Sequence, residues 1–154
     1  MGREMYEDIN RLLADFGNCL GLKSLALDQN GYYCLAFDDI YVNIEAVGES
    51  AWVLLYSSLG KVAPDAGQNI YMRLLEANYF FQHTAGASLG LETGTGLAVM
   101  TQAVNLAYME ASDLEAVMKA FVDAAEHCAQ LFNPVQESVQ PLTTPFSVNP
   151  IILA

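Results

Sequence analysis

A glycine-rich stretch, residues 83–99, holds the residue types whose spacing could do chemistry, and its sequence is HTAGASLGLETGTGLAV. Gly86, Ser88 and Gly90 stand in the G-x-S-x-G spacing of a hydrolase nucleophile elbow, in which the serine would attack an acyl carbon. Such an elbow needs a strand before the serine and a helix after it. The flanking sequence predicts the reverse order, a helix before and a strand after. We therefore expect no catalytic residue here, and an architectural role for the glycines.

Other reactive residue types are present without the spacing that a site requires. No lysine follows the second glycine cluster, which excludes a phosphate-binding loop of the P-loop kind. Cys19, Cys34 and Cys128 are far apart and odd in number, so they predict neither a disulfide framework nor a zinc site. The paired acids Asp38 and Asp39 fall in a predicted turn. We predict no metal ion and no cofactor.

Charge and composition limit the classes of partner. The 154 residues contain 6 Lys and Arg against 18 Asp and Glu, for a net charge of −12, which opposes nucleic acids and anionic lipid surfaces. Hydrophobic residues make up 53% of the chain and charged residues only 16%, an excess of apolar surface that favours a protein partner. The N-terminal residues lack a long apolar run, so we expect a cytoplasmic protein without membrane insertion.

Hydrophobic periodicity predicts a single α+β domain over residues 1–132 with three helices and five strands. The expected order is α-β-β-β-α-β-β-α. The predicted ranges are a helix from residue 5, strands at 32–37, 40–47 and 51–58, a helix at 66–82, strands at 88–92 and 97–105, and a helix at 112–132. Ser112 and Glu115 have the spacing of a capping box at the start of the last helix.

Two of these elements carry more apolar surface than one small core needs. The strand at 51–58 has large apolar residues on both faces, so both faces require cover. The helix at 66–82 has apolar residues widely around its circumference and ends in three aromatics, so we expect it to be heavily buried. Residues 133–154 contain prolines and little periodicity, which predicts a C-terminal tail.

The segment LLEANYFFQHTAGASLGLE, residues 74–92, resembles the class I type III secretion chaperones, a Tir-chaperone-like family of small acidic proteins from Gram-negative bacteria. In that family a helix ending in LLxAN passes through a glycine loop into GAxLGL. The matching residues are Leu74, Leu75, Ala77, Asn78, Gly86, Ala87, Leu89, Gly90 and Leu91.

This resemblance implies a homodimer of protomers with three helices and a five-stranded, largely antiparallel sheet. It implies a cytoplasmic chaperone, not an enzyme, that binds the N-terminal non-globular segment of one or more secreted effectors and keeps them soluble and competent for export. The secretion ATPase is a further candidate partner. By the same resemblance, the effector-binding residues are predicted as Leu12, Phe16, Leu35, Phe37, Val42, Ile44, Trp52 and Leu54. The dimer interface is predicted as Leu74, Asn78, Phe81, Leu89 and Leu91.

Two other functions compete with this interpretation. The apolar excess also suits an α+β protein that binds an apolar small molecule, which would show a large enclosed cavity within one protomer. A small serine hydrolase using Ser88 is the third alternative, and a fluorophosphonate probe that labels Ser88 would identify it.

Overall fold

The computed structural model describes the backbone of residues 2–132 and the side chains of residues 6–130. Within this range the chain forms three α-helices, one 3-10 turn and five strands in the order that the sequence predicts. Their bounds are α1 Gly2–Cys19, β1 Tyr32–Phe37, β2 Ile40–Ala46, β3 Trp52–Lys61, α2 Gln68–Asn78, η1 Tyr79–Phe81, β4 Ser88–Leu91, β5 Leu97–Asn105 and α3 Ala111–Phe132.

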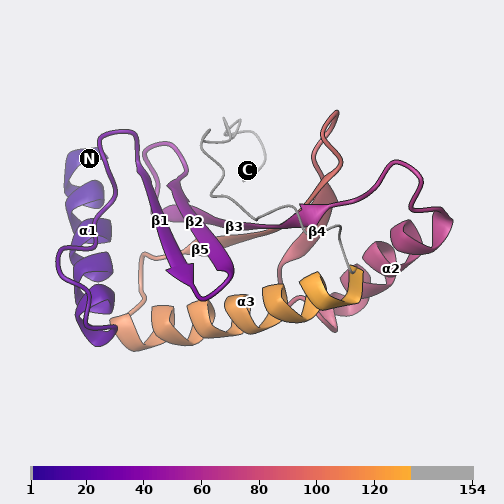
Figure 1. The fold of residues 1–154 in the computed structure, drawn as a ribbon. Helices are drawn as coiled ribbons and strands as arrows, with labels where there is room; N and C mark the ends of the chain where they lie inside the picture. Colours follow the sequence, from indigo (N-terminus) through magenta and orange to yellow (C-terminus); the bar gives the residue numbers. More distant parts are fainter. Residues whose placement is uncertain (1, 133–154) are drawn as a thin grey trace.

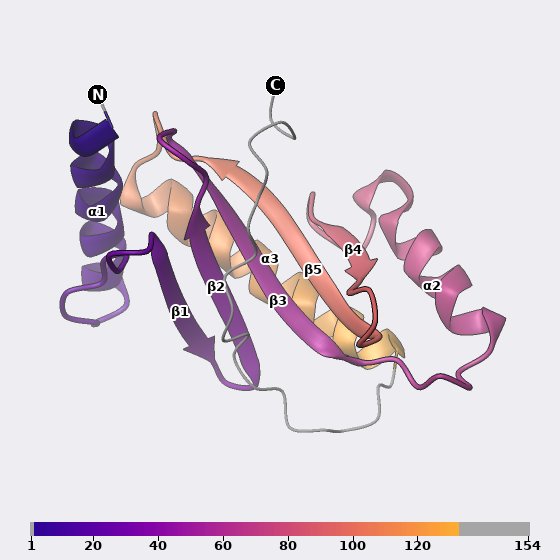
Figure 2. The ribbon, with the colours of Figure 1, turned by 90° about the horizontal axis from the view of Figure 1, so that it is seen from above.

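The strands form one antiparallel sheet in the order β1-β2-β3-β5-β4. The long helix α3 lies across one face of this sheet, with α1 at the β1 end and α2 at the β4 end (Figures 1 and 2). The first three strands are a meander with short turns, whereas β5 lies between β3 and β4 and leaves β4 at the far edge. The molecule therefore has two different ends, one built on α1 and one on α2.

Strand alternation produces the core on the helix-covered face. In β2, Val42 and Ile44 are fully buried, and their cross-strand neighbours Leu35 and Leu55 point the same way. Helices α1 and α3 close this layer with their own apolar faces, centred on the fully buried Phe16 and Phe121. Burial of this size is the main source of stability in a domain of this length.

The opposite face of the sheet carries a chain of polar side chains. The Tyr32 hydroxyl donates to Asn43 Oδ1 at 2.6 Å, Asn43 Nδ2 donates to the Tyr56 carbonyl at 3.0 Å, and the Tyr56 hydroxyl donates to Glu45 Oε2 at 3.1 Å. Burial, then the nearby Cys34 and the carboxylates, raise the pKa of Tyr32 to about 12. These residues fix the strand register on the face that no described helix covers.

Two local expectations are corrected. Helix α2 ends at Asn78, and Phe80 and Phe81 follow with φ of 48° and 54°, so the helix does not reach residue 82. In addition, α2 is not heavily buried within the protomer, because only Leu74 and Ala77 are buried in it. The apolar residues around its circumference outnumber the positions that face the sheet.

The cap of α3 differs from the predicted capping box at residues 112 and 115. The helix begins at Ala111, and the Asp113 carboxylate accepts a hydrogen bond from the Glu110 backbone N–H at 2.9 Å. The Asp113 carboxylate thus gives the Glu110 N–H, which has no acceptor within the helix, a hydrogen-bond partner. Its negative charge also interacts favourably with the positive end of the helix dipole. The predicted tail at 133–154 lies outside the described residues.

Candidate functional site

The predicted effector-binding residues occupy three different places. Leu35, Val42 and Ile44 lie in the core, whereas Trp52 and Leu54 are half-buried on the opposite face of the sheet. The remaining three residues line two surface hollows: Leu12 of α1 lines one, and Phe16 of α1 and Phe37 of β1 line the other. The structure therefore does not gather the eight residues into one site.

The first of these hollows, here called the Phe37 hollow, has a volume of about 250 Å³ and lies between the end of β1, the end of α1 and the middle of α3. Its wall is mostly apolar, with the exposed Leu20 and the half-buried Val122 at its surface. An ion pair between Lys119 and Asp123 (2.7 Å) borders it. The lining residues are Phe16, Leu20, Phe37, Glu115, Met118, Lys119, Val122 and Asp123.

An open strand edge adjoins this hollow. Strand β1 is an edge of the described sheet, and the backbone N–H and C=O of Tyr32 point away from β2, toward Asp28. Because main-chain direction alternates along an antiparallel pair, Cys34 and Ala36 present their own N–H and C=O groups on the same outer side. The strand then ends at Phe37, so backbone donors and acceptors lead directly to the apolar hollow.

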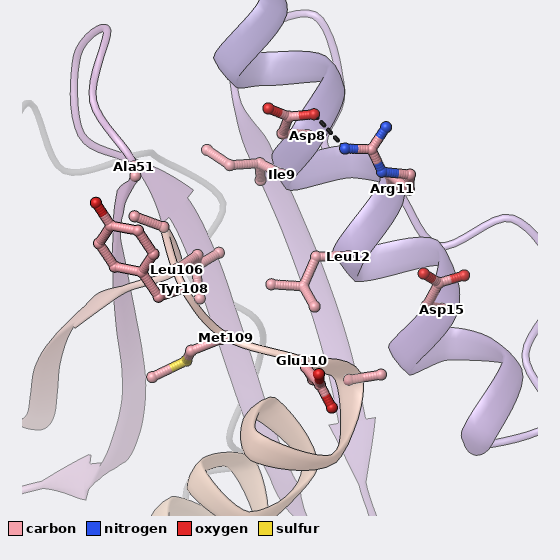
Figure 3. Close-up of a pocket in the computed structure, with 12 residues that line it drawn as sticks. Asp8, Ile9, Arg11, Leu12, Asp15, Ala51, Leu106, Tyr108, Met109 and Glu110 are labelled. Carbon is pink, nitrogen blue, oxygen red and sulfur yellow. Dashed lines mark hydrogen bonds and ion pairs between the residues drawn. The ribbon is translucent and has the colours of Figure 1, made fainter.

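The second hollow, here called the Tyr108 hollow, is larger, at about 520 Å³ (Figure 3). Its floor is apolar, formed by Ile9 and Leu12 of α1 and by Leu106 and Met109 of the β5–α3 loop. Tyr108 is 98% exposed at its border. The polar residues around it are Asp8, Arg11, Asp15 and Glu110, and the Asp8 carboxylate pairs with the Arg11 guanidinium.

The far end of the molecule has a protruding apolar surface, here called the α2 surface. It consists of residues of α2 and η1 that are exposed in the protomer: Tyr71, Met72, Leu75, Tyr79, Phe80 and Phe81. Leu75 is 72% and Phe80 78% exposed. The left-handed backbone of Phe80 and Phe81 is strained for a bulky residue, and a surrounding structure retains such strain mainly at functional positions.

The predicted dimer-interface residues divide between this surface and the interior. Phe81 and Leu91 are exposed, whereas Leu74 and Leu89 are buried in the protomer. Asn78 connects α2 to β4: its Oδ1 accepts from the Leu89 N–H at 2.8 Å, and its Nδ2 donates to the Leu89 carbonyl at 3.1 Å. The Asn78 amide thus satisfies both backbone groups of Leu89 on the outer side of β4. This contact explains why an asparagine suits the last position of the LLxAN motif.

The candidate catalytic residues are not arranged as a nucleophile elbow. Ser88 begins β4 and pairs with Thr101, with a helix before it in the chain and a strand at its own position. The two histidines pack against each other instead, with the His83 and His127 ring centroids 5.2 Å apart. Among the side chains of residues 6–130, no three from His, Cys, Asp or Glu gather as a metal site would.

Sequence reasoning missed the β5–α3 loop, the exposed Leu20 and the contribution of α3. The signal that could have found the loop is the sequence NLAYMEAS at 105–112, in which a tyrosine and a methionine stand in an irregular segment before a capped helix. None of the helices in the described part of the chain has the length and apolar character that a membrane crossing requires.

Comparison with known proteins places this fold among secretion chaperones. The model of the Tir chaperone protein (CesT) family matches residues 11–129. The transcriptional anti-antiactivator ExsC of Pseudomonas aeruginosa is 27% identical over 129 residues, which cover 83% of this chain and 88% of ExsC.

Solved structures agree in fold. A chain in the crystal structure of the ExsC–ExsE complex superposes with a TM-score of 0.69 at 28% identity, covering 86% of this chain and 98% of that chain. A chain in the structure of the HopA1–SchA chaperone–effector complex gives a TM-score of 0.65 at 21% identity, covering 82% of this chain and 94% of that chain. The predicted α+β architecture is confirmed.

Proposed function

This chain belongs to the Tir chaperone protein (CesT) family and is a type III secretion chaperone, and we propose that its client is the N-terminal non-globular segment of one or more secreted effectors. A chaperone of this kind keeps the segment extended, soluble and competent for export. The single observation that carries the proposal is the open β1 edge that leads into the apolar Phe37 hollow. Such a combination suits an extended chain with a few large apolar side chains.

In the proposed binding mode, the client adds a strand beside Cys34 and Ala36. Main-chain hydrogen bonds at this edge tolerate many sequences, because every client residue except proline offers the same donor and acceptor. Specificity then comes from a side chain that enters the Phe37 hollow and contacts Leu20 and Val122. Of the residues predicted to bind effector, we retain the half-buried Leu12, Phe37, Trp52 and Leu54 as proposed contacts. We assign the buried Phe16, Leu35, Val42 and Ile44 a supporting role in the core.

The proposed functional unit is a homodimer joined through the α2 surface. Six large apolar side chains exposed together are unusual for a monomer of this size, and aromatic residues are enriched at the centre of protein interfaces. Two residues that the sequence predicted for the dimer interface, Phe81 and Leu91, remain in this proposed interface. The exposed Leu75 and Phe80 join them. Leu74, Asn78 and Leu89 support the interface from within the protomer.

The chaperone proposal includes a cytoplasmic location and no catalytic activity. Ser88 stands on a strand rather than at a strand-to-helix turn, so its hydroxyl lacks the geometry of an elbow. Both hollows border exposed side chains, which suits a protein segment better than an enclosed apolar small molecule. The secretion ATPase is proposed as a second partner that receives the loaded complex.

The test is co-purification from cells that express the secretion system, followed by limited proteolysis of the captured protein. We expect a protected N-terminal fragment of a larger secreted protein. The Leu20→Asp variant should lose most of the capture, whereas Asn18→Asp, which adds the same charge to the same helix end outside the hollow, should retain it. If both variants capture the same amount of the protected fragment, the Phe37 hollow does not anchor the client.

A second function, control of transcription, is favoured by one specific observation. ExsC, a transcriptional anti-antiactivator, matches this chain at 27% identity over most of both sequences. We propose that this chain likewise counteracts an antiactivator of transcription. Deletion of its gene should lower expression from secretion-system promoters, and unchanged promoter activity would contradict the regulatory role.

A further inference from the structure

The Tyr108 hollow has a chemical character that the proposed strand addition does not use. Its floor is apolar, with Ile9 and Leu106 buried beneath the surface and Leu12 and Met109 half-buried above them. Its border carries the carboxylates of Asp8, Asp15 and Glu110 against one guanidinium, Arg11, for a formal net charge of −2. An apolar floor with an acidic border is complementary to a basic side chain that has apolar neighbours.

The geometry leaves two of these carboxylates available to a partner. Asp8 is occupied by Arg11, one helical turn along α1 (Figure 3). Asp15 is exposed about one turn beyond Arg11 on α1, and Glu110 is exposed immediately before α3. The two acids therefore border the hollow from different elements, so a cation in the hollow would be attracted to this side of it.

Tyr108 supplies the aromatic component of such a site. Its side chain is 98% exposed, although its neighbours in the loop are fixed by hydrogen bonds from Ala107 N to Asn105 Oδ1 and from Met109 N to the Leu106 carbonyl. An ordered loop thus holds an aromatic ring in solvent. The ring lies on the border of the hollow opposite Asp15 (Figure 3), where it can cover an apolar neighbour of the basic residue, and tyrosine is enriched at the centre of protein interfaces.

We propose that the Tyr108 hollow binds one arginine or lysine with an apolar residue on each side, in the segment of the protein that the chaperone carries. This inference deepens the proposed function and rests on it, because it names a sequence feature of the client. The basic group would lie beside the acidic border formed by Asp15 and Glu110, and its apolar neighbours would contact Leu12, Met109 and the Tyr108 ring on the opposite border. A client lacking such a residue would use only the β1 edge and the Phe37 hollow.

The test titrates the full-length, isotopically labelled chain with the capped pentapeptide ALRLA and with the same peptide carrying citrulline in place of arginine, followed by NMR. Citrulline keeps the shape of arginine without its charge. We expect saturable shifts at residues 8–15 and 106–111, and binding of the citrulline peptide about fivefold weaker, as for the loss of a few exposed ion pairs. Equal affinity for the two peptides, or shifts confined to other residues, would overturn the proposal.

Variants separate this hollow from general acidity. The double variant Asp15→Lys and Glu110→Lys should lose the preference for arginine over citrulline. Asp65→Lys, which changes the charge at an exposed position three residues before α2, should keep it. If the arginine preference holds but the chain captures no secreted protein in cells, the hollow stands and the proposed function fails. If capture succeeds while the pentapeptides bind equally, the proposed function stands and this inference fails.

Discussion

The two ends of the molecule differ in how far they bury their large apolar side chains within one chain. At the β1 end, α1 buries its large apolar residues inside the protomer, and Ile9, Leu13 and Phe16 are all nearly inaccessible. At the β4 end, α2 and η1 leave theirs outside, with Phe80 78% exposed. The first end is complete in one chain and offers hollows and an open edge to a partner. For the second end we propose that a second copy of the chain covers the exposed residues.

The largest expected contrast compares two phenylalanines, one from each end. Phe16→Ala removes a fully buried ring from the core and should lower the free energy of unfolding by about 3–5 kcal/mol. Phe80→Ala removes an exposed ring and should change the stability of the isolated protomer by about 0.5 kcal/mol or less. Urea unfolding at low protein concentration measures both. Equal losses would mean that the two ends are not different in kind.

The second prediction concerns association. Leu75→Glu places a carboxylate in the α2 surface and should weaken the dimer by about 2 kcal/mol or more, which is about thirtyfold in the dissociation constant. Leu20→Glu places the same charge at the other end and should leave the dimer unchanged. Sedimentation velocity over a dilution series reports both constants. If Leu20→Glu dissociates the dimer instead, the interface lies at the α1 end.

A third prediction compares two asparagines, Asn78 of α2 and Asn10 of α1, whose side chains hydrogen-bond the backbone of a neighbouring segment at each end. Asn78 makes two hydrogen bonds to the backbone of Leu89, and Asn10 accepts one, from the Leu27 N–H at 2.9 Å. Asn78→Ala should cost about 1–3 kcal/mol in stability, and Asn10→Ala about half as much, because fewer buried backbone groups lose a partner. Thermal unfolding of the two variants measures the difference. A greater loss for Asn10→Ala would contradict this ranking.

The smallest effect is a pH dependence at the outer face of the sheet, where burial first and then nearby Cys34 and acids raise the pKa of Tyr32 to about 12. The folded state therefore keeps a proton that the unfolded chain loses above pH 10.0, so this contribution is fully present below that pH and is lost as pH rises toward about 12. Tyr32→Phe should reduce the fall in urea midpoint between about pH 8 and about pH 11. An identical fall in both proteins would contradict it.

Periodicity predicted most of the fold because the core is built on simple alternation. Every second residue of β2 faces the helices, so the alternation of apolar residues in its sequence predicts which side chains point to the core. The end of α2 could not be predicted in the same way, because Phe80 and Phe81 adopt a left-handed backbone that their residue type disfavours. The apolar pattern continues through this break, and it therefore predicted a longer helix and a deeper burial than the protomer has.

The candidate site was only partly predictable for a related reason. A binding residue and a core residue have the same apolar character, so Val42 and Phe37 were equally good candidates in the sequence. Their difference arises from position: Val42 lies in the middle of the sheet, and Phe37 ends an edge strand beside a hollow. The Tyr108 hollow joins α1 to a loop about a hundred residues later, and no local pattern links the two.

Hydroxyl-radical footprinting of the free chaperone and of its complex with a captured effector tests the division between the two ends most directly. In the free protein at a concentration that maintains the dimer, Leu75 and Phe80 should be protected, and Leu20 and Tyr108 should be oxidised. Effector binding should then protect Leu20 and Tyr108 without further change at the α2 surface. Oxidation of Leu75 and Phe80 in the free protein, with protection only in the complex, would contradict the account.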